Sequence, residues 1–268
     1  SQDVLNERLP GIVDLAKTFA RVDPAKDPIP VVPTCHYLMG GIPTNRFGQA
    51  ITVNDKGQDE IISGLYSAGE AACVSVHGAN RLGANSLLDL VVFGRASGQQ
   101  IIDDVNHLSM PKISKSSIEK ALDRYNGWTV GKGGDSIAVM RSRLQEIMQH
   151  DFGVFRDQDA MDSGLQKIED LMESHKYTRL DDFSQTFNTA RIEALELDNL
   201  FANAYATAKC ASLRQESRGA HSRVDFPTRD DKNWHCHSVV FSGGKHLKRK
   251  VTMSTNVADS IPLKERES

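Results

Sequence analysis

The stretch 61–100 holds residue types that can bind a ligand, at spacings that would place them near one another. The short apolar run 61–66 ends just before Gly69 and Glu70, which is the pattern of a buried strand whose last residues face a ligand. The Glu70 carboxylate can accept hydrogen bonds from the hydroxyl groups of a sugar or a ribityl chain. On the pattern alone, a strand, a loop and a helix that bind nothing are an equally good interpretation.

A helix is predicted to follow this strand after a glycine-rich loop. Its apolar positions cover more than one face and predict that it is largely buried: Leu87, Leu88, Val91, Val92 and Ala96. Ser86 precedes them and is the predicted N-cap. The backbone N–H groups at such a start, with the positive end of the helix dipole, suit an electron-rich ring edge such as the pyrimidine edge of a reduced flavin.

Two basic side chains complete the set of candidate ligand-binding residues. Arg81 lies in the loop before the helix, and its planar guanidinium can hold a carboxylate by two parallel hydrogen bonds; a surface arginine is the alternative. His36 precedes Gly40 and Gly41, a position from which its side chain can project from a strand end into a cleft. A lone histidine in an apolar stretch is, however, more often a hydrogen-bonded core residue.

Composition excludes several classes of protein. A net charge of −3 and a pI near 6.3 argue against a nucleic-acid-binding protein, and no apolar run approaches the length that spans a membrane. The four cysteines lack C-x-x-C spacing, which fits reduced thiols. Adjacent residues on a strand point to opposite faces, so His235 and Cys236 cannot easily share a metal ion, and no metal site is predicted.

Three regions differ in their patterns. Residues 1–106 mix short strands with loops rich in glycine and proline, whereas the helical spacing of 114–212 predicts four helices around a shared core. Gly131, Gly133 and Gly134 are interpreted as a helix break rather than a phosphate loop. From 216 onward two strands are predicted, 236–241 and 248–254, joined by a Ser-Gly-Gly turn.

The amino-acid sequences of several segments are informative beyond their pattern of apolar and polar residues. GLYSAGE, followed by HGANRLGANSLLDLVVFGR, resembles a flavin-contacting segment of the succinate dehydrogenase and fumarate reductase flavoprotein family. Three other stretches resemble the same family in the same order: PTCHYLMGGIPTN at 33–45, RLDDFSQTFNTARIEALELDNLFANAYATA at 179–208 and ESRGAHSRVDFPTRDDKNWHCHS at 216–238. L-aspartate oxidases share parts of the HGANRL-type loop, but the continuation resembles the dehydrogenase branch.

The resemblance implies a role for each candidate. Glu70 would bind the ribityl hydroxyls of FAD, and the backbone N–H groups of Ser86 and Leu87 would face the isoalloxazine edge. His36 and Arg81 would hold a dicarboxylate substrate. The implied activity is oxidation of succinate to fumarate, with electrons passed through FAD to an iron–sulfur subunit and quinone; the reverse reaction of a fumarate reductase is the alternative. His77 is assigned no catalytic role, and the segment 216–223 is expected to form a structural network of Arg, Glu and His.

One expected element of a flavoprotein does not occur in the sequence. No G-x-G-x-x-G turn, which would hold the FAD pyrophosphate, is present in the 268 residues. We therefore interpret the chain as a C-terminal part of a longer subunit. The histidine that carries the flavin covalently and the arginine that shuttles the substrate proton are expected upstream of Ser1, so no catalytic residue is assigned here. The chain alone is not expected to retain FAD, and it could act only as a folded interaction module.

The predicted fold is α+β and multidomain. It comprises the end of a capping domain and a linker at 1–34, the C-terminal part of an FAD-binding α/β domain at 35–106, a helical bundle at 107–215 and a small β-containing region at 216–268. The resemblance implies an iron–sulfur subunit and membrane-anchor subunits as partners, and no nucleic acid. It places the protein peripherally on the cytoplasmic face of a bacterial inner membrane, or on the matrix face of a mitochondrial one.

Overall fold

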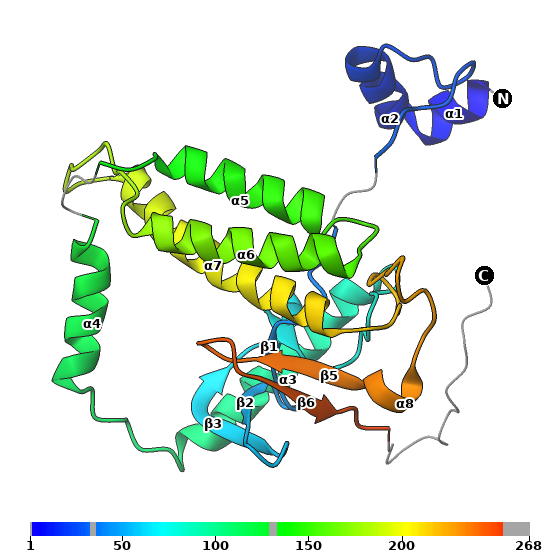
Figure 1. Cartoon of the computed structure of the whole chain (residues 1–268). Coiled ribbons are helices and arrows are strands. Elements are labelled where there is room, and N and C mark those ends of the chain that lie inside the picture. Colours follow the sequence, from blue (N-terminus) through cyan, green and yellow to red (C-terminus); the bar gives the residue numbers. More distant parts are fainter. Residues whose placement is uncertain (1, 33–35, 129–132, 254–268) are drawn as a thin grey trace. The chain divides into compact units, whose positions relative to one another are not determined.

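The computed structural model describes residues 2–32, 36–128 and 133–253, and the chain divides into two compact units, Ser1–Tyr37 and Leu38–Ser268. The first unit contains α1 (Gln2–Arg8), α2 (Pro10–Leu15) and a π-helical turn, Ala16–Ala20 (Figure 1). Pro10 suits the first turn of α2, where its missing N–H would have no helical partner. Val13 and Ala16 are the buried apolar residues described in this unit.

The second unit begins with two small sheets. β1 (Ile42–Pro43) pairs in parallel with β4 (Ala72–Cys73), and β2 (Gln49–Val53) pairs antiparallel with β3 (Asp59–Tyr66). Gly41 makes the first pairing possible, because its φ is +118° and a Cβ there would lie 2.6 Å from the carbonyl oxygen of Ala71. A 3₁₀ turn, Gly69–Ala71, connects β3 to β4.

The strand predicted at 61–66 forms, but the prediction that it is buried is wrong. The buried residues of this sheet lie on β2, at Ala50, Ile51 and Val53. Every residue of β3 is exposed except Tyr66, which is half-buried. β3 pairs with β2 in a two-stranded sheet, and its apolar residues Ile61, Ile62 and Leu65 stay exposed.

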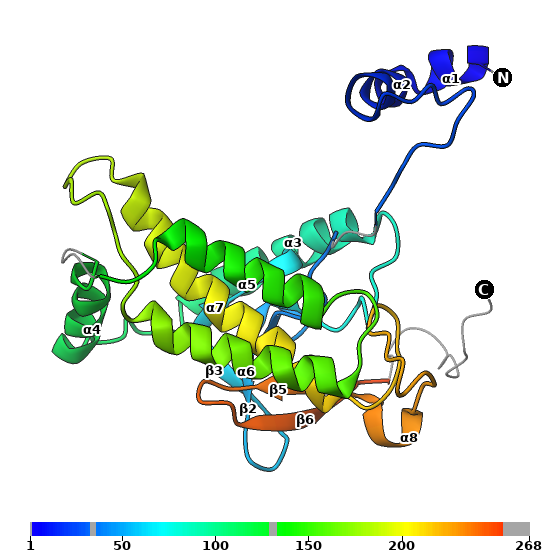
Figure 2. The same cartoon turned by 45° about the horizontal axis from the view of Figure 1, so that its top comes forward.

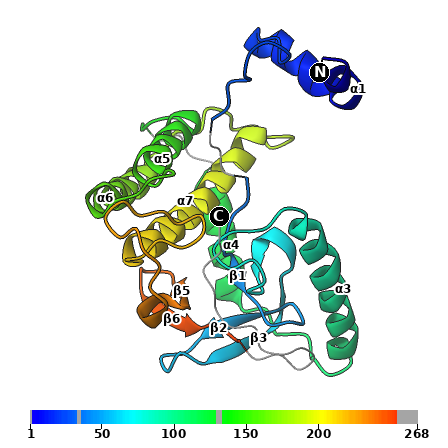
Figure 3. The same cartoon turned by 90° about the vertical axis from the view of Figure 1, so that its right-hand side faces the viewer.

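α3 (Asn85–Val105) also differs from its prediction. It begins one residue before Ser86, and its N-cap is Ala84 in the left-handed conformation, so the prediction of Ser86 as N-cap is wrong. The prediction of a largely buried helix is wrong as well. Its buried residues are Asp89 and Ser97, whereas Leu87 and Val91 are each 70% exposed. Figure 3 shows why: α3 lies at the margin of the second unit, with the small strands on one side of it.

Four more helices follow: α4 (Lys115–Asn126), α5 (Ile137–Asp151), α6 (Gln158–His175) and α7 (Thr189–Leu213). A side-chain oxygen caps the start of each, supplied by Ser114, Ser136, Asp157 and Asn188 respectively. α5, α6 and α7 lie side by side around one core (Figures 1 and 2). The core includes Met140, Leu144, Met161, Ile168, Leu197 and Phe201.

The predicted core of four helices is therefore a core of three. α4 buries none of its residues and attaches to α7 through polar groups. Arg124 donates to Asp198 and to the carbonyl oxygen of Leu195, and Arg191 donates to the Tyr125 hydroxyl. Gly131 lies outside the described residues, while Gly134 lies in a loop where a Cβ would come within 2.3 Å of the Tyr177 carbonyl oxygen.

The chain continues with α8 (Asp231–Trp234) and a hairpin of β5 (Cys236–Val240) and β6 (His246–Lys250). The predicted hairpin is confirmed, with its second strand at 246–250 and not at 248–254. Gly243 and Gly244 both have positive φ, at +85° and +82°, as the turn requires. The α+β class is confirmed, and the four-part domain division stays a prediction.

Candidate functional site

Arg81 lies in the loop between β4 and α3, residues 74–84, which we call the Arg81 loop. Its guanidinium is half-buried and donates to the Leu82 carbonyl oxygen at 3.1 Å. The same carbonyl accepts the N–H of Asn85, the first residue of α3, at 3.3 Å. Because one carbonyl oxygen receives both groups, the Arg81 side chain and the start of α3 are fixed to the same peptide.

A second contact connects the Arg81 loop to α3. His77 Nε2 lies 2.9 Å from Asp89 Oδ2, and the side chains are 14% and 3% exposed. The histidine therefore connects the loop to the second turn of the helix that follows it. The sequence signal for this contact is Asp89 itself, a lone carboxylate within the apolar run SLLDLVV.

The start of α3 differs from the starts of α4, α5, α6 and α7. They carry side-chain caps, whereas no side-chain oxygen of the described residues caps α3. The first-turn backbone N–H groups, including those of Ser86 and Leu87, have no partner within the helix ladder. They and the positive end of the helix dipole favour an acceptor or an anion at this position.

Glu70 lies in the 3₁₀ turn that packs against α3. Gly69, with a φ of +73°, makes this approach possible, because a Cβ there would meet the Leu90 side chain at 2.4 Å. Glu70 is exposed, and its Oε1 accepts the N–H of Leu38 at 2.8 Å. A carboxylate has about four acceptor positions, so it can accept further hydroxyl groups beside this bond.

The candidate residues divide between the two units. His36 is exposed and belongs to the first unit, whereas Glu70, Arg81, Ser86 and Leu87 all belong to the second. The structure packs the turn of Glu70 and the Arg81 loop against α3. The pairing of His36 with Arg81 stays a prediction.

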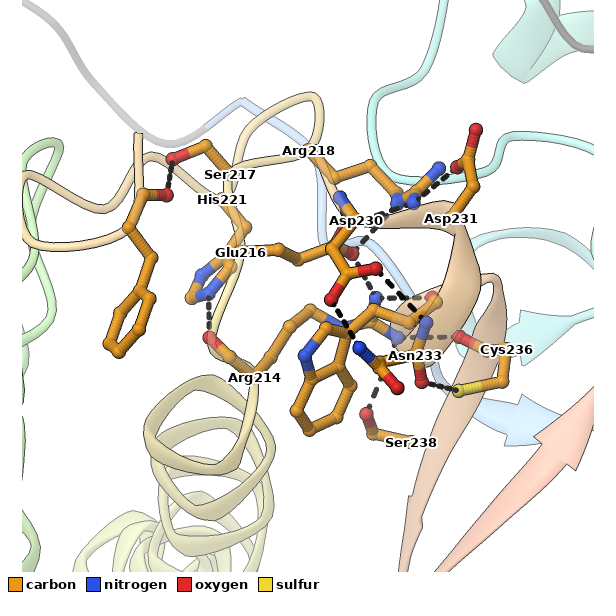
Figure 4. A network of polar contacts seen from close by, with 12 residues as sticks. Arg214, Glu216, Ser217, Arg218, His221, Asp230, Asp231, Asn233, Cys236 and Ser238 are labelled. Carbon is orange, nitrogen blue, oxygen red and sulfur yellow. Dashed lines mark hydrogen bonds and ion pairs between the residues drawn. The ribbon is translucent and has the colours of Figure 1, made fainter. Parts of the chain in front are cut away.

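The segment 216–223 forms the expected network of Arg, Glu and His (Figure 4). Glu216 is fully buried and accepts two hydrogen bonds from Arg218, at 2.8 and 2.9 Å, and one from the backbone N–H of Asp230. Burial acts to raise the pKa of Glu216, but these hydrogen bonds and that from Arg214 outweigh it, so the pKa is lowered.

His221 is held as one neutral tautomer in the same network. Its Nδ1 lies 2.9 Å from Arg156 Nη1, which can only donate, so Nδ1 is the acceptor. Its Nε2 therefore carries the proton and donates to the Arg214 carbonyl oxygen at 3.0 Å. Burial lowers the pKa of His221, and the nearby positive charges of Arg156, Arg223 and Arg214 lower it further.

Comparison with known proteins places the chain in a class of flavoproteins. Residues 1–87 match a family described as an FAD binding domain, and residues 141–268 match one described as the fumarate reductase flavoprotein C-terminus. FAD is therefore the cofactor of the family, and the chain belongs to the succinate dehydrogenase and fumarate reductase flavoproteins, as the resemblance indicated.

Individual relatives agree with this assignment. The chain is 51% identical, over 99% of its length, to the succinate dehydrogenase flavoprotein subunit of Coxiella burnetii, and 44% identical, over 97%, to that of Rickettsia bellii. It covers 46% and 44% of those two proteins, so it spans less than half of their length. A solved structure of E. coli quinol fumarate reductase FrdA superposes with a TM-score of 0.82 at 35% identity, over 95% of this chain and 43% of that one.

Membrane-spanning helices and metal-binding clusters do not occur among the described residues. None of the described helices is both long and apolar enough to cross a membrane. Residues 2–32, 36–128 and 133–253 contain no cluster of three or more His, Cys, Asp or Glu side chains suited to a metal ion. Cys73, Cys210 and Cys236 are free thiols, while Cys35 lies outside the described residues.

Proposed function

We propose that this chain is the C-terminal part of the flavoprotein subunit of a succinate dehydrogenase, which oxidises succinate to fumarate. The observation that supports this most is that the turn of Glu70 and the Arg81 loop both pack against α3, whose start carries no side-chain cap, in a chain of this family. Each of the three offers a group of the type that its proposed ligand requires.

The described residues fit the flavin part of FAD. The Glu70 carboxylate would accept hydrogen bonds from the ribityl hydroxyls, and the first-turn N–H groups at Ser86 and Leu87 would donate to the isoalloxazine edge. When bound, FAD supplies the acceptor for the hydride that leaves the substrate. The N–H groups and the helix dipole stabilise negative charge at that edge, and they do so without reorganisation because the helix fixes their positions.

Arg81 and His36 would hold the substrate dicarboxylate. The guanidinium of Arg81 offers two parallel N–H groups to one carboxylate, which orients as well as binds it. His36 would donate to a carboxylate oxygen. Fixing the carboxylates fixes the methylene carbons between them, and correct orientation is a large part of the rate of such a reaction. The base that takes the proton from the other methylene carbon is not among these residues.

The partners and the location are part of the same proposal. The names of the relatives describe a subunit, so we propose that an iron–sulfur subunit receives the electrons and that anchor subunits attach the assembly to the membrane. The proposed location is the cytoplasmic face of a bacterial inner membrane, or the matrix face of a mitochondrial one. The described helices supply no membrane span, which fits peripheral attachment through partners.

A fumarate reductase is the second candidate, because the likeness to E. coli FrdA extends over 95% of the chain. Two assays of the complete subunit with its partners distinguish succinate oxidation from fumarate reduction. The first measures succinate-dependent dye reduction, and the second measures fumarate-dependent oxidation of reduced viologen. We expect the first activity to be the faster at equal substrate concentration. A faster second activity would favour the reductase, and the absence of both in a flavin-loaded subunit would refute the proposed function and favour a folded interaction module.

A further inference from the structure

The Arg81 loop is held from outside by the C-terminal part of the chain. Its backbone at Ala79 accepts the N–H of Ala220 at 3.0 Å, so the loop meets the turn 218–221 directly. Ser75 Oγ lies 3.0 Å from His237 Nε2 on β5. His77 also contacts α3. The loop is therefore fixed at Ser75, His77 and Ala79, by β5, α3 and the turn 218–221 respectively.

Gly219 makes the contact with the loop unusually close. Its φ is +58°, and a Cβ at this position would lie 2.7 Å from both the carbonyl carbon and the oxygen of Ala79 and 2.9 Å from its Cβ. Those atoms are mostly backbone, so no side-chain rotation can make room. Any residue other than glycine at 219 must displace either the turn or the loop.

The turn is the less movable of the two. Arg218 and His221 exchange backbone hydrogen bonds at 2.8 and 3.1 Å, which closes the turn. The Arg218 guanidinium is held at both ends, by the fully buried Glu216 and by Asp231 at 2.7 Å. The His221 ring is fixed by its two hydrogen bonds. A displacement at 219 is therefore transmitted to Ala79 and the Arg81 loop.

We propose that Gly219, backed by Arg218 and Glu216, is a positioning residue that sets where the Arg81 loop presents its guanidinium to the substrate. The inference rests on the proposed function for the role of Arg81. It assigns a task to the segment 216–223, which the sequence had suggested only as a structural network. The substrate class is the dicarboxylate that Arg81 would bind.

The test compares Gly219→Ala with Gly243→Ala in the complete subunit. Both glycines have positive φ, but a Cβ at Gly243 meets nothing within 4 Å, so this control carries the backbone strain without the collision. For Gly219→Ala we expect faster hydrogen exchange in residues 74–84 and a rise of about tenfold in the KM for succinate, because small displacements of an orienting group are costly. Flavin content should change less than twofold, and Gly243→Ala should leave exchange in 74–84 and KM at the wild-type values.

Arg218→Lys is the second variant, in case Gly219→Ala does not fold. It keeps a positive charge beside Glu216 but removes the two-pronged contact, so the turn loosens without added bulk. We expect faster exchange in 74–84 and a KM increase of about threefold.

The two readouts separate this inference from the proposed function. Exchange in 74–84 needs no substrate, so it reports on the loop even in a protein that oxidises no succinate, and wild-type exchange in both variants would overturn the inference. Faster exchange with an unchanged KM in an active enzyme would show that the turn holds the loop but does not position Arg81, and this too would overturn it.

Discussion

Replacement of Arg81 by lysine tests the proposed substrate contact most directly. Lysine keeps the positive charge but lacks the planar fork, so one of the two parallel bonds to the substrate carboxylate is lost. A charge-assisted hydrogen bond contributes about 1.5–3 kcal/mol, and each 1.36 kcal/mol changes a rate tenfold, so kcat/KM for succinate should fall between roughly 10-fold and 150-fold. The loop should remain in place, because Asn85 and the contact of His77 with Asp89 still fix it.

The assay is succinate-dependent dye reduction by the complete subunit, with the flavin content measured from the absorbance spectrum. Arg179→Lys is a matched control, since this arginine is half exposed and pairs with Asp181 at 2.7 Å in another part of the second unit. The control should keep its wild-type activity. If Arg81→Lys with full flavin content also oxidised succinate at a near-normal rate, Arg81 would not be the carboxylate ligand, and the proposed binding mode would be refuted.

The remaining predictions concern the cofactor, the helical core and the response to acid. The chain purified alone should show no stoichiometric flavin absorbance, because its sequence lacks the glycine turn that holds the pyrophosphate; a band near one equivalent would contradict this. Limited proteolysis should leave a stable core that contains α5, α6 and α7, and rapid degradation of all three would show that their shared core does not fold by itself. The Arg223 guanidinium lowers the pKa of Asp225 to about 2, so the pair stabilises the fold above the ordinary aspartate pKa of about 3.9 and this stabilisation is lost as the pH falls toward 2. The difference in urea midpoint between wild type and Asp225→Asn should therefore shrink from pH 5 to pH 3, and a constant difference would contradict the pairing.

Local signals in the sequence predicted local structure well. The Gly243–Gly244 turn predicts the hairpin because positive φ at both positions is what such a turn needs. The apolar spacing of 137–211 predicts the helices of the bundle because their core residues lie at helical intervals along the chain. Even so, α4 shows the same spacing and stays outside the core, since spacing does not reveal which partner a helix has.

The failed N-cap prediction and the contacts that the sequence did not reveal both depend on how the Arg81 loop folds. Ser86 has the preferred residue type for an N-cap, but the Arg81 loop reaches the helix through Ala84, and the conformation of the loop overrides the local preference. The contact of Ser75 with His237 joins residues 162 positions apart, and no local pattern marks either one. Of the candidate site, the sequence therefore identified the individual residues of the Arg81 loop and its surroundings, but not the groups that hold them.

The exposed apolar side of α3 has a consequence for the physical behaviour of the chain. Four of its apolar side chains are each more than half exposed: Leu87, Leu88, Val91 and Val92. Ile61 of β3 is also more than half exposed. Patches of this kind drive association between molecules, and the free N–H and C=O groups of an exposed strand edge add a template for pairing. The average molar mass measured by light scattering should therefore increase with protein concentration while the helical circular dichroism per residue stays constant. A poor yield of the chain alone would then result from association between folded molecules. It would not indicate that the sequence fails to fold.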